Sequence, residues 1–176
     1  MSGYSPVDHW LTLRLGESET ELELQTSDDV RHATDLMVQQ ATHSLDIFSR
    51  DLDEAIYDRE AFLDAIRQLC IRNRKTEIRV LIQEPKIATK SGHRFIDLAR
   101  KLSSSIEMRH VYSDYQQYNK AFLIADRIGM IKRPFADLFE GSANFNCQVI
   151  ATRQREFFTE VWERSSPHPD LRQLYI

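Results

Sequence analysis

The chain has 176 residues, of which 41% are hydrophobic and 28% charged, and its formal net charge is −4. This length and composition fit one globular domain and argue against a disordered or membrane-spanning protein. The acidic balance also argues against a protein whose whole surface grips nucleic acid, because such binding neutralises phosphates with Lys and Arg.

Signals for targeting and metal binding are missing from the sequence. No apolar run approaches the ~20 residues that span a bilayer, and the start at Met1 lacks the basic and apolar regions of a secretory signal. Cys70 and Cys147 are most simply free thiols, and no Cys/His spacing around them is typical of a metal site. We therefore expect a cytoplasmic domain with no membrane span, no metal and no other cofactor.

Hydrophobic periods predict the secondary structure. Residues 10–15 and 20–24 alternate in polarity around a short polar segment, which predicts an N-terminal β-hairpin over about residues 10–25. Ser27 with the two aspartates after it is an N-cap signal. The periods then predict helices at 29–43, 59–73, 91–102 and 152–165, strands at 44–52, 77–82, 106–111, 121–125 and 129–132, and a loop after residue 133.

This order of elements predicts an α/β fold. Alternating strands and helices indicate a mixed, mostly parallel sheet flanked by helices on both faces, closed by an antiparallel pair at 121–125 and 129–132. No internal repeat, linker or low-complexity tract divides the chain. We therefore expect a single domain over residues 1–176, with its core at about 28–165.

The segment around the strand at 121–125 carries a motif. Asn119-Lys120-Ala121-Phe122-Leu123-Ile124-Ala125-Asp126, followed by Gly141-Ser142-Ala143-Asn144, resembles the HxKxxxxD and GSxN signature of the phospholipase D superfamily. The element order over residues 28–165 resembles one half of that fold. Gly92-His93-Arg94 and Trp162-Glu163-Arg164-Ser165 are further similar to an uncharacterised bacterial group of phospholipase D-like domains, sometimes attached to acetyltransferases.

The resemblance implies a lost active site. Family members use the His as a nucleophile toward phosphorus and the Lys to bind phosphate oxygens, but Asn119 and Ala121 stand at these positions, and Asp126 matches the Asp. An amide nitrogen is not nucleophilic and a methyl group carries no charge. The separation from Asp126 to Gly141 is longer than the family's usual spacing, and such a tetrapeptide is also a common turn.

Two groups of residues are candidates for ligand binding. The basic loop follows the carboxyl end of a parallel strand, where open α/β sheets bind ligands, and it precedes a helix N-terminus with free N–H groups. The alternative for this loop is a capping Ser91 with solvated basic side chains. The candidates are Lys86, Lys90, His93 and Arg94 in the basic loop, and Asn119, Asp126, Ser142 and Asn144 in the degenerate motif.

Other chemistry remains open. A displaced active site of His93, Lys90 and Asp126 would make the chain a phosphodiesterase or nuclease. A slipped register would use Tyr118 and Lys120, although it would turn the apolar side chains of the strand to the opposite face. The charges at 46–54 either bind a divalent cation or pair with nearby arginines.

We therefore expect a non-catalytic phospholipase D-like domain that binds a phosphorylated ligand, a nucleotide or a protein partner in a regulatory or accessory role. Nucleic acid has weaker support as a ligand because the net charge is negative. A purely structural interaction module is a further alternative. Since family enzymes pair two halves and this chain holds one, the resemblance implies a homodimer.

Overall fold

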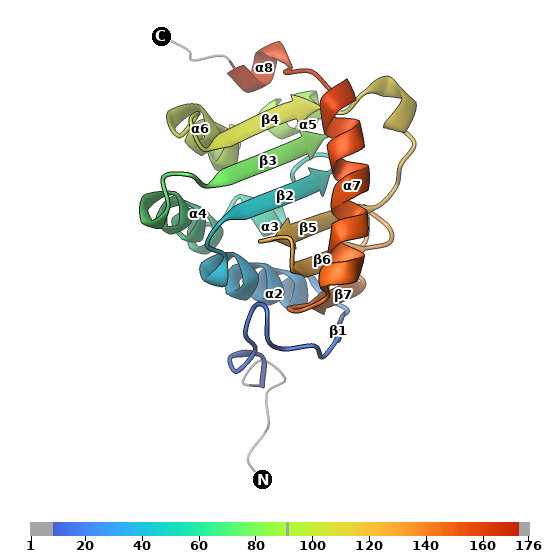
Figure 1. Ribbon diagram of the computed structural model, residues 1–176. Coiled ribbons are helices and arrows are strands. Elements are labelled where there is room, and N and C mark those ends of the chain that lie inside the picture. Colours follow the sequence, from blue (N-terminus) through green and yellow to red (C-terminus); the bar gives the residue numbers. More distant parts are fainter. Residues whose placement is uncertain (1–8, 91, 173–176) are drawn as a thin grey trace.

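One mixed sheet organises the molecule. The computed structural model describes residues 9–90 and 92–172, and within them seven strands lie in the order β1-β7-β6-β5-β2-β3-β4 (Figure 1). The strands are β1 (Leu22–Leu24), β2 (Ser44–Ser49), β3 (Glu77–Ile82), β4 (Ile106–His110), β5 (Ala121–Ala125), β6 (Gly129–Arg133) and β7 (Gly141–Asn144).

The sheet has a parallel half and an antiparallel half. Strands β2, β3 and β4 run parallel, whereas β2 pairs antiparallel with β5, which continues through β6 and β7 to β1. Helical crossovers are required between parallel strands, while the β5–β6 pair needs only a tight turn. The predicted α/β fold with a mixed sheet is therefore confirmed, but the sheet is not mostly parallel as expected, because four of the six pairings between the described strands are antiparallel.

Helices cover both faces of the sheet, as predicted. One core cluster joins the sheet to α2, α4 and α6, and a second joins the other face to α7, which crosses the front of the sheet in Figure 1. No helix in the described part of the chain is long and apolar enough to cross a membrane. The helices are α2 (Ser27–Gln40), α3 (Glu54–Tyr57), α4 (Glu60–Arg72), α5 (Pro85–Lys90), α6 (Arg94–Lys101), α7 (Gln148–Arg164) and α8 (Pro169–Arg172), with a 3-10 turn η1 (Ser113–Tyr115).

The N-cap of helix α2 lies one residue before the predicted cap, Ser27, which is the first residue of the helix. Thr26 is the N-cap: its side chain accepts a hydrogen bond from Asp29 N–H, and the Asp29 carboxylate accepts from the Thr26 N–H in return. This reciprocal capping box satisfies two N–H groups that the first helical turn leaves open.

The predicted N-terminal hairpin is wrong in its first strand. Residues 9–12 form a helical turn with hydrogen bonds from Thr12 N–H to the His9 carbonyl and from Leu13 N–H to the Trp10 carbonyl. Trp10 and Leu13 are buried and Leu11 is exposed, so burial follows a three-residue spacing rather than alternation. The second predicted strand exists as β1, and it pairs with β7.

Two further segments differ from the prediction. Gly141–Asn144, expected in a loop, forms β7 because it pairs with both β1 and β6. Pro85–Lys90, expected as loop, forms the short helix α5, which Pro85 can begin because its missing N–H has no helical partner there.

A buried ion-pair network fixes α7 to the sheet. The Asp46 side chain on β2 is only 2% exposed, and its two oxygens accept hydrogen bonds from Arg79 Nε at 2.7 Å and from Arg155 Nε at 3.1 Å. Arg79 comes from β3 and also donates to Thr159 Oγ1, and Arg155 comes from α7. Of the two readings of the charges at 46–54, pairing with nearby arginines is therefore confirmed at Asp46, whose carboxylate is structural.

Candidate functional site

The first two motif positions lie at one end of β5. Asn119 precedes the strand and is exposed, and Ala121 is its first residue and is buried. The Asn119 side-chain oxygen accepts a hydrogen bond from the Arg50 guanidinium, which comes from the carboxyl end of β2. Because β2 and β5 are antiparallel neighbours, the residue after β2 reaches the start of β5. Arg50 forms no ion pair with any described residue.

A buried arginine stands beside the position where the resemblance places the lysine. Arg133 is directly opposite Ala121 in the β5–β6 pair, so both side chains share one face of the sheet. Its Nε donates to the Leu138 carbonyl at 2.7 Å, and a terminal nitrogen donates to the Ala136 carbonyl and lies 3.5 Å from an Asp53 oxygen. The Nε and one terminal nitrogen of this guanidinium are therefore engaged within the protein.

The loop at residues 134–140 contacts both Asn119 and Arg133. Ala136 N–H donates to the Asn119 carbonyl at 2.9 Å, and Arg133 binds two carbonyls of the loop. Phe139 of the loop packs against the Arg133 guanidinium, 5.1 Å from the ring centre. The loop that lengthens the motif therefore packs against Arg133 and the Asn119 backbone, while Asn119 itself remains exposed.

The end of β2 is rich in charge. Asp51 is half-buried, and its pKa is raised by burial and by the neighbouring carboxylates Asp53 and Glu84, while Arg50 opposes the shift. The backbone of Glu84, which precedes α5, donates to the Arg50 carbonyl at 2.7 Å. This edge therefore combines one arginine without an ion pair and three carboxylates.

Asp126 lies at the other end of β5 and is a structural residue. Its carboxylate accepts hydrogen bonds from the N–H groups of Thr42, His43 and Ser44 at 2.8, 2.8 and 3.0 Å. These groups belong to the segment that enters β2. Asp126 thus ties the β5–β6 turn to the start of β2, and a strand's length separates it from Asn119.

Ser142 and Asn144 lie two strands away from β5. Ser142 is between Glu23 of β1 and Lys132 of β6, and the Asn144 amide donates to the Glu19 carbonyl at 3.2 Å. The Asn144 oxygen accepts from Asn146 N–H, which shapes the turn into α7. The structure therefore does not bring Ser142 or Asn144 together with Asn119.

The basic loop contains two exposed lysines and a buried, hydrogen-bonded histidine. Lys86 and Lys90 are exposed on α5, with no partner among the described residues. His93 is buried: its Nδ1 accepts from Phe95 N–H as the N-cap of α6, and its Nε2 donates to the Leu52 carbonyl at 2.7 Å. The expected cap, Ser91, lies outside the described residues.

Arg94 and His93 are not arranged for phosphate chemistry in this structure. Arg94 forms ion pairs with Asp58 at 2.7 Å and Glu60 at 3.4 Å. His93 has both ring nitrogens engaged, and Asp126 lies at the opposite end of the sheet from the β2 and β3 carboxyl ends. The proposed triad of His93, Lys90 and Asp126 therefore does not form a shared site here.

The sequence did not single out the two arginines, Arg50 and Arg133, that contact the first motif positions. Arg50 appeared only among the charges at 46–54, and Arg133 lay just beyond the strand predicted at 129–132. The alternation of residues 129–133 places Arg133 on the same face as Ile131, and this was the one available signal that it points into the protein. Its carbonyl partners belong to a loop whose path the sequence pattern does not predict.

Comparison with known proteins gives a family and a fold. A family described as a domain of unknown function, DUF7931, matches residues 26–174. The chain belongs to the DUF7931 family. No curated protein matches the chain in sequence.

Solved structures resemble this DUF7931 domain across most of its length. Nuc from Salmonella typhimurium, a phospholipase D family member, is 10% identical with a TM-score of 0.63, over 85% of this chain and 97% of that one. NucT from Helicobacter pylori is 8% identical with a TM-score of 0.54, over 85% and 98%. The archaeal chromatin protein TrmBL2 is 14% identical with a TM-score of 0.59, over 96% of this chain and 57% of that one.

The DUF7931 domain thus has the phospholipase D-like fold, as the sequence resemblance implied. It spans 57% of the TrmBL2 chain, which is described as showing a novel mode of DNA binding. At these low identities the likeness concerns the fold alone.

Proposed function

We propose that this domain is a non-catalytic phospholipase D-like domain that binds a phosphate-containing ligand, in a regulatory or accessory role. The observation that carries the proposal is Arg50. Its guanidinium is held by the neutral amide of Asn119 instead of a carboxylate. A guanidinium whose charge is not cancelled by an ion pair offers the fork of donors that phosphate oxygens bind.

Nearby lysines support an anionic ligand. Lys120 follows Asn119, and Lys86 and Lys90 lie on α5, which begins next to the segment that hydrogen-bonds Arg50. All three side chains are exposed and have no partner among the described residues. This edge lies beyond the carboxyl ends of the parallel strands, where open α/β sheets bind ligands.

The motif residues support binding without catalysis. Asn119 supplies no nucleophile and Ala121 no charge, and the neighbouring Arg133 binds two carbonyls of the 134–140 loop and lies beside Asp53. The ligand could be a nucleotide, a nucleic-acid backbone or a phosphorylated protein, since all three present the same phosphate oxygens. The fold shared with Nuc and with TrmBL2 makes nucleic acid the first of these to test.

The test is a titration with three probes: inorganic phosphate, a nucleotide mixture and a single-stranded oligonucleotide, each followed by melting temperature and calorimetry. Arg50→Gln is expected to weaken binding at least tenfold, and binding of an oligonucleotide should weaken with salt. Arg74→Gln is the matched control, because Arg74 is exposed on a turn remote from this edge. Equal binding by Arg50→Gln and the native chain, or no binding of any probe, would overturn the proposal.

We also propose a homodimer formed through the surface beside Asn119. Phe135 and Leu138 of the 134–140 loop are 55% and 44% exposed, and such apolar side chains on a loop that covers the motif suit burial against a second copy. A cytoplasmic location is part of the same proposal and rests on the free thiols Cys70 and Cys147.

Light scattering during gel filtration tests the dimer. At micromolar concentration the native chain should elute with the mass of two copies, and a variant with Phe135→Asp and Leu138→Asp should elute with the mass of one. Val149→Asp serves as the control, because Val149 is equally apolar and exposed at the start of α7. A monomeric native chain would refute this part of the proposal.

A further inference from the structure

Strand β4 is an edge of the sheet, and part of that edge is unpaired. Ile78 N–H donates to the Ser105 carbonyl and Val111 N–H donates to the Ile82 carbonyl. Residues 105, 107, 109 and 111 therefore direct their backbone groups toward β3, and residues 106, 108 and 110 direct theirs away from it.

Among these outward positions, only Met108 has an N–H without a backbone partner in the described part of the chain, so the edge is open there. Ile106 N–H donates to the Leu102 carbonyl, and His110 N–H donates to the Ser166 carbonyl at 2.8 Å. Between them Met108 has no backbone partner on its outer side among the described residues. An unpaired N–H and C=O on a strand edge form a template for another extended chain.

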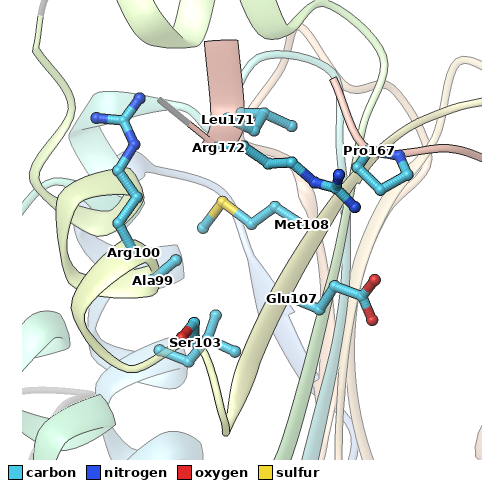
Figure 2. A pocket seen from close by; sticks show the side chains of 9 residues that line it. Ala99, Arg100, Ser103, Glu107, Met108, Pro167, Leu171 and Arg172 are labelled. Atoms are coloured by element: carbon cyan, nitrogen blue, oxygen red, sulfur yellow. The ribbon is translucent and has the colours of Figure 1, made fainter. Parts of the chain in front are cut away.

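A hollow of about 400 Å³ follows this open edge. Figure 2 shows Met108 and Ala99 within it, Leu171 and Arg172 above it and Ser103 below it. Three consecutive residues of β4 line it, so it lies along this part of the strand. The full lining is Ala99, Arg100, Ser103, Ile106, Glu107, Met108, Pro167, Leu171 and Arg172.

The charge at this hollow is positive. Arg172 extends across it toward Pro167 in Figure 2 and has no ion-pair partner among the described residues. The Glu107 carboxylate is already paired with Arg109 at 3.1 Å. Arg100 pairs with Asp97, and its Nε is buried without a hydrogen-bond acceptor in the described part of the chain. A buried donor without an acceptor is uncommon and costs free energy.

We propose that this groove binds a short extended peptide segment that ends in a carboxylate. The peptide backbone adds as a strand at Met108, its side chains alternate toward the apolar floor and toward solvent, and its carboxylate binds Arg172. The groove admits only a short segment, because the bonds at Ile106 and His110 close the edge at both ends. This site lies at the far edge of the sheet from β5 and is independent of the anion-binding edge at Arg50.

The proposal is tested by nuclear magnetic resonance with a pool of acetylated tripeptides of random sequence carrying free C-terminal carboxylates. The amide resonance of Met108 should shift and its hydrogen exchange should slow. The same pool as carboxamides should bind at least tenfold more weakly, and Arg172→Gln should weaken binding of the carboxylate pool alike. Arg74→Gln should leave binding unchanged, since that exposed arginine is remote from β4.

Two results would overturn the proposal. One is the absence of any shift at Met108 with millimolar peptide. The other is an equal shift with hexanoate, which would mean that the groove accepts any small carboxylate and that strand addition contributes nothing.

Discussion

At the scale of single residues, the β5–β6 turn concentrates unusual backbone geometry. Asp126 and Arg127 both have positive φ, 52° and 63°, and Ile128 N–H closes the turn on the Ala125 carbonyl at 3.0 Å. This is the geometry of the hairpin turns that match strand twist, in which Asn or Asp followed by Gly is favoured. Asp126 suits its position, whereas Arg127 occupies one that favours glycine.

Arg127→Gly is therefore expected to stabilise the protein. Removing a Cβ from a left-handed position relieves about 1–2 kcal/mol, and the added freedom of the unfolded chain offsets about 0.5–1 kcal/mol of it. The free energy of unfolding in urea should rise by up to about 1 kcal/mol. Arg74→Gly, on an exposed turn without positive φ, should give no gain, and an equal gain there would contradict the explanation.

Asp126→Ala is expected to destabilise the domain by about 2–4 kcal/mol. It leaves three N–H groups of residues 42–44 without their carboxylate acceptor, and hydrogen bonds to a charged group contribute more than neutral ones. Asp126→Asn keeps one acceptor oxygen, and asparagine tolerates positive φ. This variant should therefore lose less free energy of unfolding than Asp126→Ala. Urea unfolding measures both, and an alanine variant as stable as the native chain would remove the structural role of Asp126.

At the scale of elements, α7 depends on one buried carboxylate. Asp46 holds Arg79 and Arg155 between the sheet and the helix, and Arg79 also lies 4.9 Å from the ring centre of Phe158. Removing one member of a buried ionic group leaves the others uncompensated, which costs more than the group contributes as a whole.

Asp46→Ala should accordingly cost about 3–5 kcal/mol and raise hydrogen exchange along α7 more than along α2. Asp28→Ala is the control, because Asp28 forms an exposed pair with Arg31 and such pairs contribute ~0–1 kcal/mol. Similar losses in the two variants would mean that the buried network does not fix the helix.

The hydrophobic pattern predicted the elements in which the apolar residues of the sequence are also the buried residues of the structure. Strands β3 and β5 have the predicted bounds because continuous apolar runs with Pro85 or Asp126 after them leave no other assignment. Residues 10–15 failed because leucines two apart imitate a strand while burial falls on Trp10 and Leu13. Gly141–Asn144 failed because a strand of small and polar residues is specified by its neighbours β1 and β6.

The candidate site was predictable only in part. The motif located Asn119 and Ala121 near the start of β5. A sequence motif does not, however, state how far apart its residues lie in the folded protein. Asn119 lies before β5 and Asp126 follows its other end, so the length of the strand separates them, and His93 is buried as a helix cap. The partners that decide the site, Arg50 and Arg133, are brought in by strand pairing and by a loop.

At the scale of the whole molecule, the segment after α7, up to residue 172, is attached to the β4 edge. The bridge between His110 and Ser166 and the bond from Arg100 to the Asp170 carbonyl at 2.5 Å attach the segment after α7 to β4 and α6. The rings of His110 and His168 meet edge to face with centres 5.4 Å apart. Burial and the nearby His168 lower the pKa of His110, against the opposing effect of the Gln83 carbonyl.

Stability should therefore fall as the solution is acidified. The pKa of His110 in the folded state is below its unfolded value of ~6.5, so the unfolded chain binds more protons in that range. The stability that neutral His110 gives is present above about pH 6.5 and is lost as the pH falls below it. Melting temperature against pH should show this decline, and His110→Gln should flatten it. An unchanged slope in that variant would assign the decline to other groups.

The pairing of Arg133 with the position of Ala121 bears on how this domain can change. A lysine introduced at 121 would point at a guanidinium on the adjacent strand, and two like charges at that distance repel. Restoring the histidine and lysine of the motif would thus be destabilising unless residue 133 and its loop changed as well. The fold therefore has room for one cation at this point, supplied either by residue 121 of β5 or by residue 133 of β6.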